Sequence, residues 1–509
     1  MFDLNAPPGE VCLATIGVRL ILTVICVYIV LVLAIGLFSH RLFRKTGEDY
    51  FVATRSIGSF VLFMSLFGTH MTAFSILGAS GESYHEGIGV FALMASSSAL
   101  IVPAVFLFVG TKLWALGKKY GYVTQIEYFR ERWNSDGVGL LLFIVLNLLL
   151  VPYLLIGLMG GGITLTQITK GFVPEWVGGL MVIVVTSIYV IYGGMRGTAW
   201  VNTFQTLIFM VCGGLAFSVI SSSMGGFQSA MEKVAGTNPD LLIRGSHIKP
   251  LQLLTYTLIP LSVGMFPHLF NHWLTANRAK AFKQTIIFYP IAIAIVWVPS
   301  VLLGVLGTVN FPGLQGPAAN SILIRMIEMH ANKVLAGVLA AGVISAVMNS
   351  LDSQSLAIGS MFTEMVQHHR FQERMSERQK VFYGRFFVLI ILFGTYALSL
   401  VTGRSIFRLG IWSFTGFAAL FPVVIAALYW KRSTKQGAYA SIFSVIILWI
   451  YFFFKAGMSE TYTVANSGIM PVAVLFIVSA ASMIIFSYMT KAPEDATLAR
   501  FFPHKLESI

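Results

Sequence analysis

Three features of the sequence predict an all-α polytopic membrane protein. Of its 509 residues, 56% are hydrophobic and only 11% are charged, whereas a soluble domain carries about 25% charged residues. The mean hydropathy is +0.80. The apolar residues gather in runs of about 20, the length that an α-helix needs to cross a bilayer. We therefore expect an integral membrane protein whose helices lie in the lipid bilayer.

Charge and cysteine content exclude several other classes of protein. The net charge is +13, but Lys and Arg fall in short loops between apolar runs, as membrane topology requires, so we expect no nucleic-acid partner. The three cysteines have no metal-ligand spacing. The sequence has no phosphate-cradling glycine-rich lysine motif and nothing that suggests bond-breaking chemistry, so we expect neither an enzyme nor a cofactor.

The apolar runs predict about thirteen spans. The first is expected to stay in the mature chain, because the N-terminus lacks the basic region of a cleaved signal peptide. The predicted spans are Gly17–Phe38, Ile57–Ala79, Gly87–Leu116, Val138–Thr169, Val177–Tyr192, Thr203–Ser223, Leu251–Leu274, Thr285–Gly307, Val334–Met365, Phe386–Val401, Ile406–Tyr429, Ala438–Phe454 and Met470–Met489.

The loop charges predict the orientation of the chain. The basic stretches HRLFRK, GKKYGYVTQIEYFRERW, NRAKAFK, HHRFQERMSERQK and YWKRSTK all fall on one side, which the positive-inside rule makes cytoplasmic. We expect a plasma-membrane protein, the inner membrane of a bacterium, with its N-terminus outside and its C-terminus inside. The loops Met224–Pro250 and Val309–Lys333 then lie outside. Their short surface helices either gate an opening on the outer face or merely connect the spans.

Two predicted spans are interrupted in their middle. The second span holds Gly68, Thr69, His70 and Thr72 there, and the seventh holds Pro260, Gly264 and Pro267. Proline and glycine weaken a helix and free its backbone groups. Each interrupted span opens a block of five, and matched interruptions in two halves point to the binding site of a transporter. The alternative is that both residue types are simply frequent in membrane helices.

The ninth span is polar at its centre. Within Ala340–Glu364, the residues Ala346, Asn349, Ser350 and Ser353 follow helical spacing on one face, and Asp352 flanks them. Oxygen ligands are what a hard cation accepts in place of water, and an ionisable group at mid-membrane suggests a functional site. The alternative is that small and hydroxyl side chains pack helices together.

Five stretches, in order, resemble the sodium:solute symporter family. They are GEDYFVATRSIGSFVLFMSLFGTHMTAFSILGASGESYHEGIG, IYGGMRGTAWVNTFQ, FPHLFNHWLTA, AVMNSLDSQ and GFAALFPVVIAALYWKR. The resemblance implies a five-plus-five inverted-repeat core of the leucine-transporter type at 48–437. An extra helix and linker at 1–47 precede it, and two helices with a tail at 438–509 follow. It also implies uptake of a small organic solute together with sodium as the coupling ion.

The resemblance also implies an ion site. Its ligands would be the backbone carbonyls of Gly68, Met71 and Ala346, with the side chains of Asn349 and Ser350. Family members usually have Ser and then Ser or Thr at these last two positions, so an amide oxygen must serve at Asn349.

Two further departures from the family leave the ion stoichiometry open. The carboxylate that several members place in the second-span break is His70, and the usual sixth-span Asp is Asn202. The ninth span instead carries Asp352, so Asn202, Asp352 and Ser353 are candidates for a second ion or proton site. Alternatively, Asp352 turns toward the cytoplasmic vestibule and is hydrated.

The solute site is expected just after the second-span break. The Glu-Gln pair of the sugar cotransporters corresponds to Phe74 and Ser75, so sugar is not the expected solute. Ile259 and Val263 add an apolar wall, which suits a small carboxylate, amino acid or vitamin-like compound. His70 is the candidate cation beside it, or else a hydrogen-bonded packing residue.

Sodium-coupled symport by a monomer is the function that these features predict. One alternative is a proton-coupled symporter that uses Asp352 or His70. The other is a membrane sensor in which this fold reports solute to a partner.

Overall fold

The computed structural model describes residues 8–42, 46–244, 248–370, 375–403, 405–457, 459 and 462–502. Within these ranges the chain is helical, and its one isolated β-bridge joins Ile57 to Ala276. The predicted all-α fold is confirmed. Residues 1–7 and 43–45 of the predicted leading segment, and 503–509 of the predicted tail, lie outside the described residues. The division at 47 and 437 stays a prediction.

Ten helical stretches of the described chain are long and apolar enough to cross a membrane. In chain order they are α1 (Pro8–Ser39); η4 (Phe91–Ala95), α5 (Ser96–Val105), η5 (Phe106–Gly110) and α6 (Thr111–Tyr120) as one run; α8 (Asp136–Ile168); α9 (Glu175–Ser223); α14 (Ala281–Asn310); α16 (Lys333–Arg370); α17 (Glu377–Ser399); α18 (Ile406–Ala419) with α19 (Phe421–Tyr429); α20 (Lys435–Lys455); and α21 (Pro471–Met489).

Helix α9 joins the predicted fifth and sixth spans. It has 49 residues, which at about 1.5 Å each is roughly 74 Å, more than twice the thickness of a bilayer core. Gly194 lies between the two predicted spans with φ 52° and ψ −152°, and a Cβ there would lie 2.7 Å from the Tyr50 carbonyl oxygen. Glycine therefore permits both the kink and the close contact. The total of thirteen spans stays a prediction, because it depends on counting α9 as two.

Two further pairs of helices are bent where the sequence predicts interruptions. The axis turns by 56° between α3 (Ser59–His70) and η3 (Phe74–Gly78) with α4 (Ala79–Glu86). It turns by 50° between α12 (Pro250–Tyr256) with η7 (Ile259–Gly264) and α13 (Pro267–Leu274). The backbone of Met71 is extended directly after α3. Pro267 begins α13, where its missing N–H removes no hydrogen bond of the helix.

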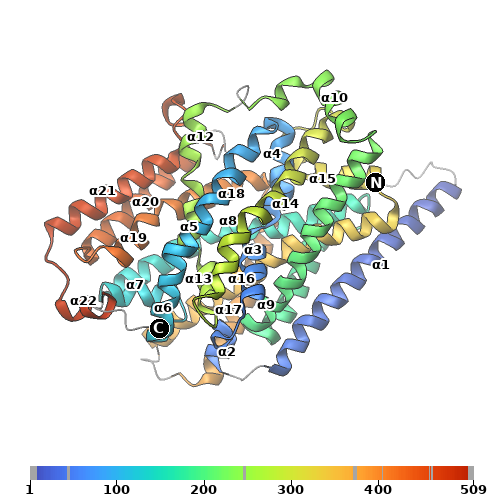
Figure 1. The fold of residues 1–509 in the computed structure, drawn as a ribbon. Helices are drawn as coiled ribbons and strands as arrows, with labels where there is room; N and C mark the ends of the chain where they lie inside the picture. Colours follow the sequence, from blue (N-terminus) through green and yellow to red (C-terminus); the bar gives the residue numbers. More distant parts are fainter. Residues whose placement is uncertain are drawn as a thin grey trace.

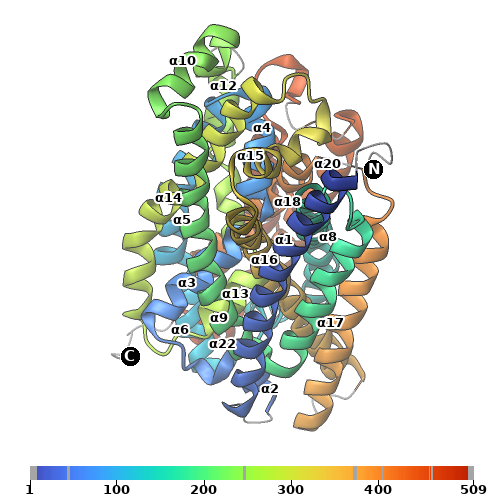
Figure 2. The ribbon, with the colours of Figure 1, turned by 90° about the vertical axis from the view of Figure 1, so that its right-hand side faces the viewer.

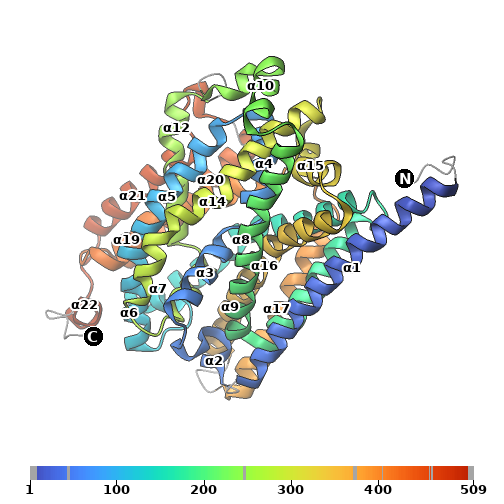
Figure 3. The ribbon, with the colours of Figure 1, turned by 45° about the vertical axis from the view of Figure 1, so that its right-hand side comes forward.

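Short helices cover the two ends of the bundle (Figure 1). We call these ends the α10 end and the α7 end. The α10 end carries α10 (Phe227–Thr237), η6 (Pro239–Leu242), η8 (Gly316–Ser321) and α15 (Ile322–His330). The α7 end carries η1 (His40–Leu42), α2 (Gly47–Val52), η2 (Ala53–Arg55), α7 (Gln125–Arg132) and α22 (Asp495–Phe501). The short helix η9 (Val464–Asn466) precedes α21. Helix α1 leans along the outside of the bundle against α9 and α16 (Figures 2 and 3).

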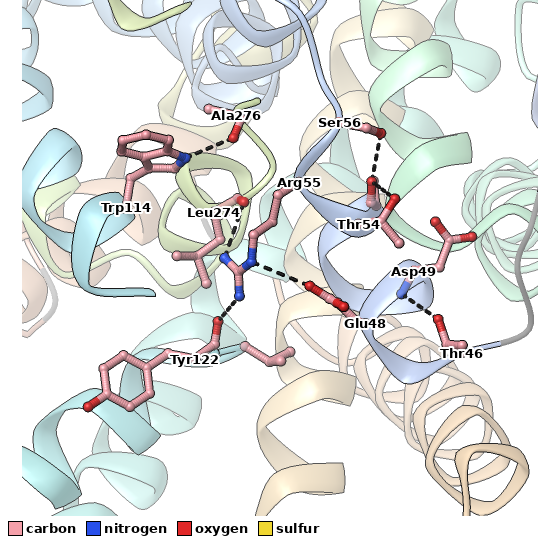
Figure 4. A network of polar contacts seen from close by, with 12 residues as sticks. Thr46, Glu48, Asp49, Thr54, Arg55, Ser56, Trp114, Tyr122, Leu274 and Ala276 are labelled. Carbon is pink, nitrogen blue, oxygen red and sulfur yellow. Dashed lines mark hydrogen bonds and ion pairs between the residues drawn. The ribbon is translucent and has the colours of Figure 1, made fainter. Parts of the chain in front are cut away.

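At the α7 end, the linker before α3 is bonded to the linker after α13 (Figure 4). Ile57 N donates to Thr275 O at 2.9 Å, and Asn277 N donates to Ile57 O at 3.0 Å. Arg55 donates to the carbonyl oxygens of Tyr122 at 2.8 Å and of Leu274 at 3.4 Å. The ends of the two bent pairs are therefore held together at this end of the molecule.

Candidate functional site

A fully buried carboxylate, Asp352 of α16, lies at the centre of the bundle among neutral hydrogen-bond donors. Tyr189 of α9 donates its hydroxyl to Asp352 Oδ2 at 2.9 Å, and Ser353 donates to Oδ1 at 2.9 Å. Among the described residues, no Lys or Arg forms an ion pair with Asp352. A buried carboxylate costs much free energy unless a cation or a proton neutralises it.

Asn202 of α9 completes this group. Its amide lies 2.9 Å from Ser353 Oγ and 3.0 Å from Thr69 Oγ1. In the amide orientation that lets its nitrogen donate to acceptors, that nitrogen donates to Asp352 Oδ2 at 2.8 Å. The structure thus brings Asn202, Asp352 and Ser353 into one hydrogen-bonded cluster, and Asp352 turns toward α9.

Thr69 and His272 connect this cluster to both bent helix pairs. Thr69 Oγ1, at the end of α3, lies 2.6 Å from Ser353 Oγ. His272 of α13 has its Nε2 3.0 Å from Ser353 Oγ and its Nδ1 2.8 Å from Ser65 Oγ. Both half-helices therefore contact α16 through the same serine.

Gly68 of α3 lies directly against Asn349 of α16. A Cβ on Gly68 would lie 1.9 Å from Thr206 Oγ1 and 2.5 Å from the Asn349 amide, so only glycine fits. Asn349 donates its amide hydrogens to the Asn202 carbonyl and to Thr206 Oγ1, both at 3.0 Å. This geometry leaves the amide oxygen of Asn349 beside the α3 backbone.

The other predicted ion ligands are buried on the same elements. Met71 follows the end of α3, and its backbone N donates to Phe67 O at 2.9 Å. Ala346 lies one turn before Asn349 on α16, and it is 1% exposed. Ser350 is also buried, and its hydroxyl contacts the Val347 carbonyl of its own helix at 3.4 Å.

His70 points toward α14 rather than toward α16. Its Nδ1 forms a short hydrogen bond with the hydroxyl of Tyr289, and the two rings stack with centroids 6.0 Å apart. Phe266, between η7 and α13, lies on its other side at 6.2 Å. This is the arrangement that the packing alternative for His70 predicts.

An aromatic cluster fills the space beside the first break. Phe74 stacks on Phe407 with centroids 4.7 Å apart and meets Phe414 edge-on at 5.0 Å. Phe414 also contacts Tyr153 of α8 at 4.9 Å and Phe266 at 5.6 Å. Rings from α8, α18 and both breaks therefore contact one another and form an apolar region.

The remaining predicted solute residues border this region. Ile259 and Val263 are fully buried in η7, which packs against α18. Ser75 donates its hydroxyl to Thr72 O at 2.9 Å, so this group is used by the local turn. His268, in the first turn of α13, has its ring near those of Tyr153 and Phe266, and neither of its ring nitrogens has a hydrogen-bond partner among the described residues.

The sequence analysis did not identify several partners in this site. They are Thr69, Tyr189, Thr206, Phe266, His268, His272 and Phe414. His268 and His272 stand in the interrupted seventh span with helical spacing, and this signal was available in the sequence. Tyr189 gives no such signal, because its contact with Asp352 joins residues 163 positions apart.

A family model and several known proteins match most of the chain. The model of the sodium:solute symporter family matches residues 50–445. The high-affinity proline transporter of Bacillus subtilis (strain 168) is 25% identical over 490 residues, which cover 92% of this chain and 98% of the relative. The sodium/pantothenate symporter of Escherichia coli (strain K12) is 26% identical over 436 residues, which cover 82% of this chain and 86% of the relative.

Solved structures share the fold at low sequence identity. A Na+-coupled sialic acid symporter in a substrate-bound outward-open state matches with a TM-score of 0.77 at 16% identity, covering 93% of this chain and 99% of that one. A nucleobase-cation-symport-1 family transporter in a closed conformation matches with a TM-score of 0.56 at 11% identity, covering 89% of this chain and 97% of that one. These relatives are transporters and not enzymes. The family match spans most of the sequence, and the chain belongs to the sodium:solute symporter family.

Proposed function

We propose that the protein couples the inward movement of sodium to the uptake of a small organic solute by alternating access. The observation that carries this proposal is that both bent helix pairs meet α16 at one buried cluster containing an unpaired carboxylate. Ser353 contacts Thr69 of the first pair and His272 of the second. An ion bound in this cluster would contact both halves of the fold, which is what coupling requires.

The proposed main ion site comprises Gly68, Met71, Ala346, Asn349 and Ser350. The contact between Gly68 and Asn349 supports it, because the amide oxygen lies beside the unwinding end of α3. Sodium accepts backbone carbonyl, amide and hydroxyl oxygens as ligands. Asn202, Asp352 and Ser353 form the proposed second site, where the negative charge of Asp352 would favour a cation.

The proposed solute is a small carboxylate, an amino acid or a vitamin-like compound. Relatives of this chain are named as proline and pantothenate symporters, and both compounds carry a carboxylate. The aromatic cluster around Phe74, Phe266 and Phe414 supports an apolar contact surface for such a compound. His70 and Ser75 remain proposed polar contacts together with Ile259 and Val263 as the wall.

Proton coupling is the second candidate, and the surroundings of Asp352 favour it. The partners of its carboxylate are the neutral side chains of Tyr189, Asn202 and Ser353. A proton would neutralise the carboxylate as well as a sodium ion would. The two candidates therefore differ in the ion at one residue and share the rest of the mechanism.

For the orientation we propose that the α7 end is cytoplasmic and that the protein acts as a monomer in the plasma membrane. The last turn of α6 carries Lys118 and Lys119, and α7 carries Arg130 and Arg132; the positive-inside rule places such residues in the cytoplasm. Labelling of a single cysteine placed at Lys119 in intact cells would test the assignment. Labelling by a membrane-impermeant reagent would overturn it.

A screen of thermal stability tests the function. Purified protein is heated with candidate carboxylates, amino acids and vitamins, once in sodium chloride and once in potassium chloride at the same pH. A transported solute should raise the melting temperature, and more so in sodium, because ligands that bind only the folded state stabilise it. Equal shifts in both salts, with a dependence on pH, would favour the proton.

A further inference from the structure

A pocket of 280 Å³ opens at the α7 end, away from the proposed transport site. It lies between the end of α7, the start of α20 and the segment that follows α21. Its charged lining residues are three cations, Arg132, Lys435 and Lys491, and one carboxylate, Glu494. The lining is therefore net positive.

Arg132, which lines this pocket, has an unused donor. The residue is fully buried. It donates from Nε to Ala427 O at 2.9 Å and from Nη2 to Trp430 O at 3.1 Å and to Ser433 Oγ at 3.0 Å. Its Nη1 has no partner, and no carboxylate of the described chain pairs with it.

Two part-buried arginines of the protein, Arg130 and Arg196, pair with carboxylates. Arg196 pairs with Asp49 at 2.7 Å. Burial without such a partner lowers the pKa of Arg132, and an anion would stabilise the charged guanidinium. A guanidinium with a free N–H group is suited to bind phosphate or carboxylate.

The start of α20 adds a second favourable group. Thr434 caps this helix by accepting from Gly437 N at 3.2 Å, and Lys435 lies in the first turn. The helix has 21 residues, and the N-terminus of a long helix carries a partial positive charge with free N–H groups. The helix end and Arg132 line the same pocket.

An apolar groove of 570 Å³ runs along the outside of the bundle beside this pocket. It is lined by Phe421, Ile425, Trp430, Phe476, Met483 and Tyr488, which belong to α19, α21 and the residue after α19. Both helices lie at the edge of the ribbon in Figure 1. The groove and the pocket are lined by neighbouring parts of the same two segments, the end of α19 with the residues after it and the end of α21 with the residues after it. The segment after α19 contributes Trp430 to the groove and Thr434 to the pocket, and the end of α21 leads from Tyr488 to Lys491.

Arg432 lies in the chain between Trp430, which lines the groove, and Thr434, which lines the pocket. Its guanidinium is 5.8 Å from the centre of the Tyr488 ring and donates from Nη2 to Thr490 O at 2.6 Å. Its Nη1, like that of Arg132, is buried and has no partner in the described part of the chain. A cation with an unused donor therefore also lies near Tyr488 of the groove.

We propose that this pocket binds the phosphate group of an anionic phospholipid, whose acyl chain lies in the groove between α19 and α21. The guanidinium groups and Lys435 recognise the charge of the phosphate, and the groove recognises the hydrocarbon. Tyr488 is 66% exposed and Ile484 is 48% exposed on this face, so a lipid in the surrounding leaflet reaches the groove directly. This site does not depend on the proposed solute or coupling ion.

The test measures the melting temperature of the full-length protein in detergent. The additions are dioleoylphosphatidylglycerol in mixed micelles, dioleoylphosphatidylcholine in the same micelles, or inorganic phosphate at equal sodium concentration. Phosphatidylglycerol should raise the melting temperature by several degrees and saturate, while the other two additions should not. Equal protection by phosphatidylcholine would overturn recognition of charge, and equal protection by phosphate would overturn recognition of a lipid.

Variants locate the site. Lys435→Gln with Lys491→Gln removes two exposed cations and should raise the half-saturating phosphatidylglycerol concentration by about tenfold or more, since each lysine near an anionic lipid contributes roughly 1 kcal/mol. Lys455→Gln, at the opposite end of α20, is the matched control and should change nothing. If the double variant behaves like this control, the pocket is not the site.

The groove is tested separately on α21. Ala480→Trp places a large side chain in the groove and should weaken the response to phosphatidylglycerol. Ile477→Trp, on an exposed part of the same helix, should leave the response unchanged. The same response in both tryptophan variants would overturn the acyl-chain part of the proposal.

Discussion

The polar cluster around Asp352 and the aromatic cluster around Phe74 lie beside the same two breaks but are built in opposite ways. In the polar cluster, Thr69, Asn202 and Ser353 bond to one another, so each position is fixed by several partners. In the aromatic cluster the contacts are between rings, and within the described ranges neither nitrogen of the adjoining His268 has a hydrogen-bond partner. Directional bonds select an ion by geometry, whereas rings accept apolar bodies of varied shape.

The largest effect is expected from Asp352→Asn, which removes the only charge of the polar cluster among the described residues. Uptake should lose its sodium cooperativity or its pH dependence, because the amide can take neither a proton nor the role of a charged ligand. Uptake is measured against sodium at several pH values. Asp136→Asn changes an acid that is 68% exposed at the start of α8 and serves as the control. Unchanged curves in Asp352→Asn would make Asp352 a bystander.

Gly68→Ala tests how tightly the polar cluster is packed. The new methyl group would overlap Thr206 Oγ1 and the Asn349 amide, so we expect a loss of stability of about 1–3 kcal/mol, the usual cost of overpacking. Thermal unfolding measures it. Gly213→Ala in α9 is the control, because a Cβ there meets no atom within 4 Å. A Gly68→Ala protein as stable as that control would contradict the packing described here.

Ser350→Ala removes one proposed ion ligand without disturbing the cluster. The Ser350 hydroxyl contacts a carbonyl of its own helix, so we expect little loss of stability. The sodium concentration for half-maximal uptake should rise about tenfold, the effect of losing roughly 1.4 kcal/mol, while solute affinity at saturating sodium should hold. Unchanged sodium dependence would remove Ser350 from the site.

The smallest effect, a few-fold, is expected from His70→Ala, which tests the aromatic side of the comparison. If His70 contacts the solute, the half-saturating solute concentration should rise while the protein stays folded. Tyr289→Phe is the matched variant, because it breaks the same hydrogen bond and keeps the imidazole. A loss of stability in both variants with unchanged solute affinity would make His70 a packing residue.

The sequence predicted the elements of the site better than their contacts. Proline and glycine marked both bent pairs, because each alters the backbone locally. The sequence also suggested that Asn202 and Asp352 share one site, and the structure brings them together. The contact of Tyr189 with Asp352 depends on the rotation of helices far apart in the chain, which local spacing does not determine. The aromatic cluster was missed for the same reason.

The backbone bridge between Ile57 and Ala276 has a mechanical consequence. It fastens the linker of one bent pair to the linker of the other, so the α7-end tips of α3 and α13 are parts of one body while the bridge holds. Any movement that parts them must first break these two hydrogen bonds. The two half-helices are therefore expected to move together, so that a displacement of one also displaces the other.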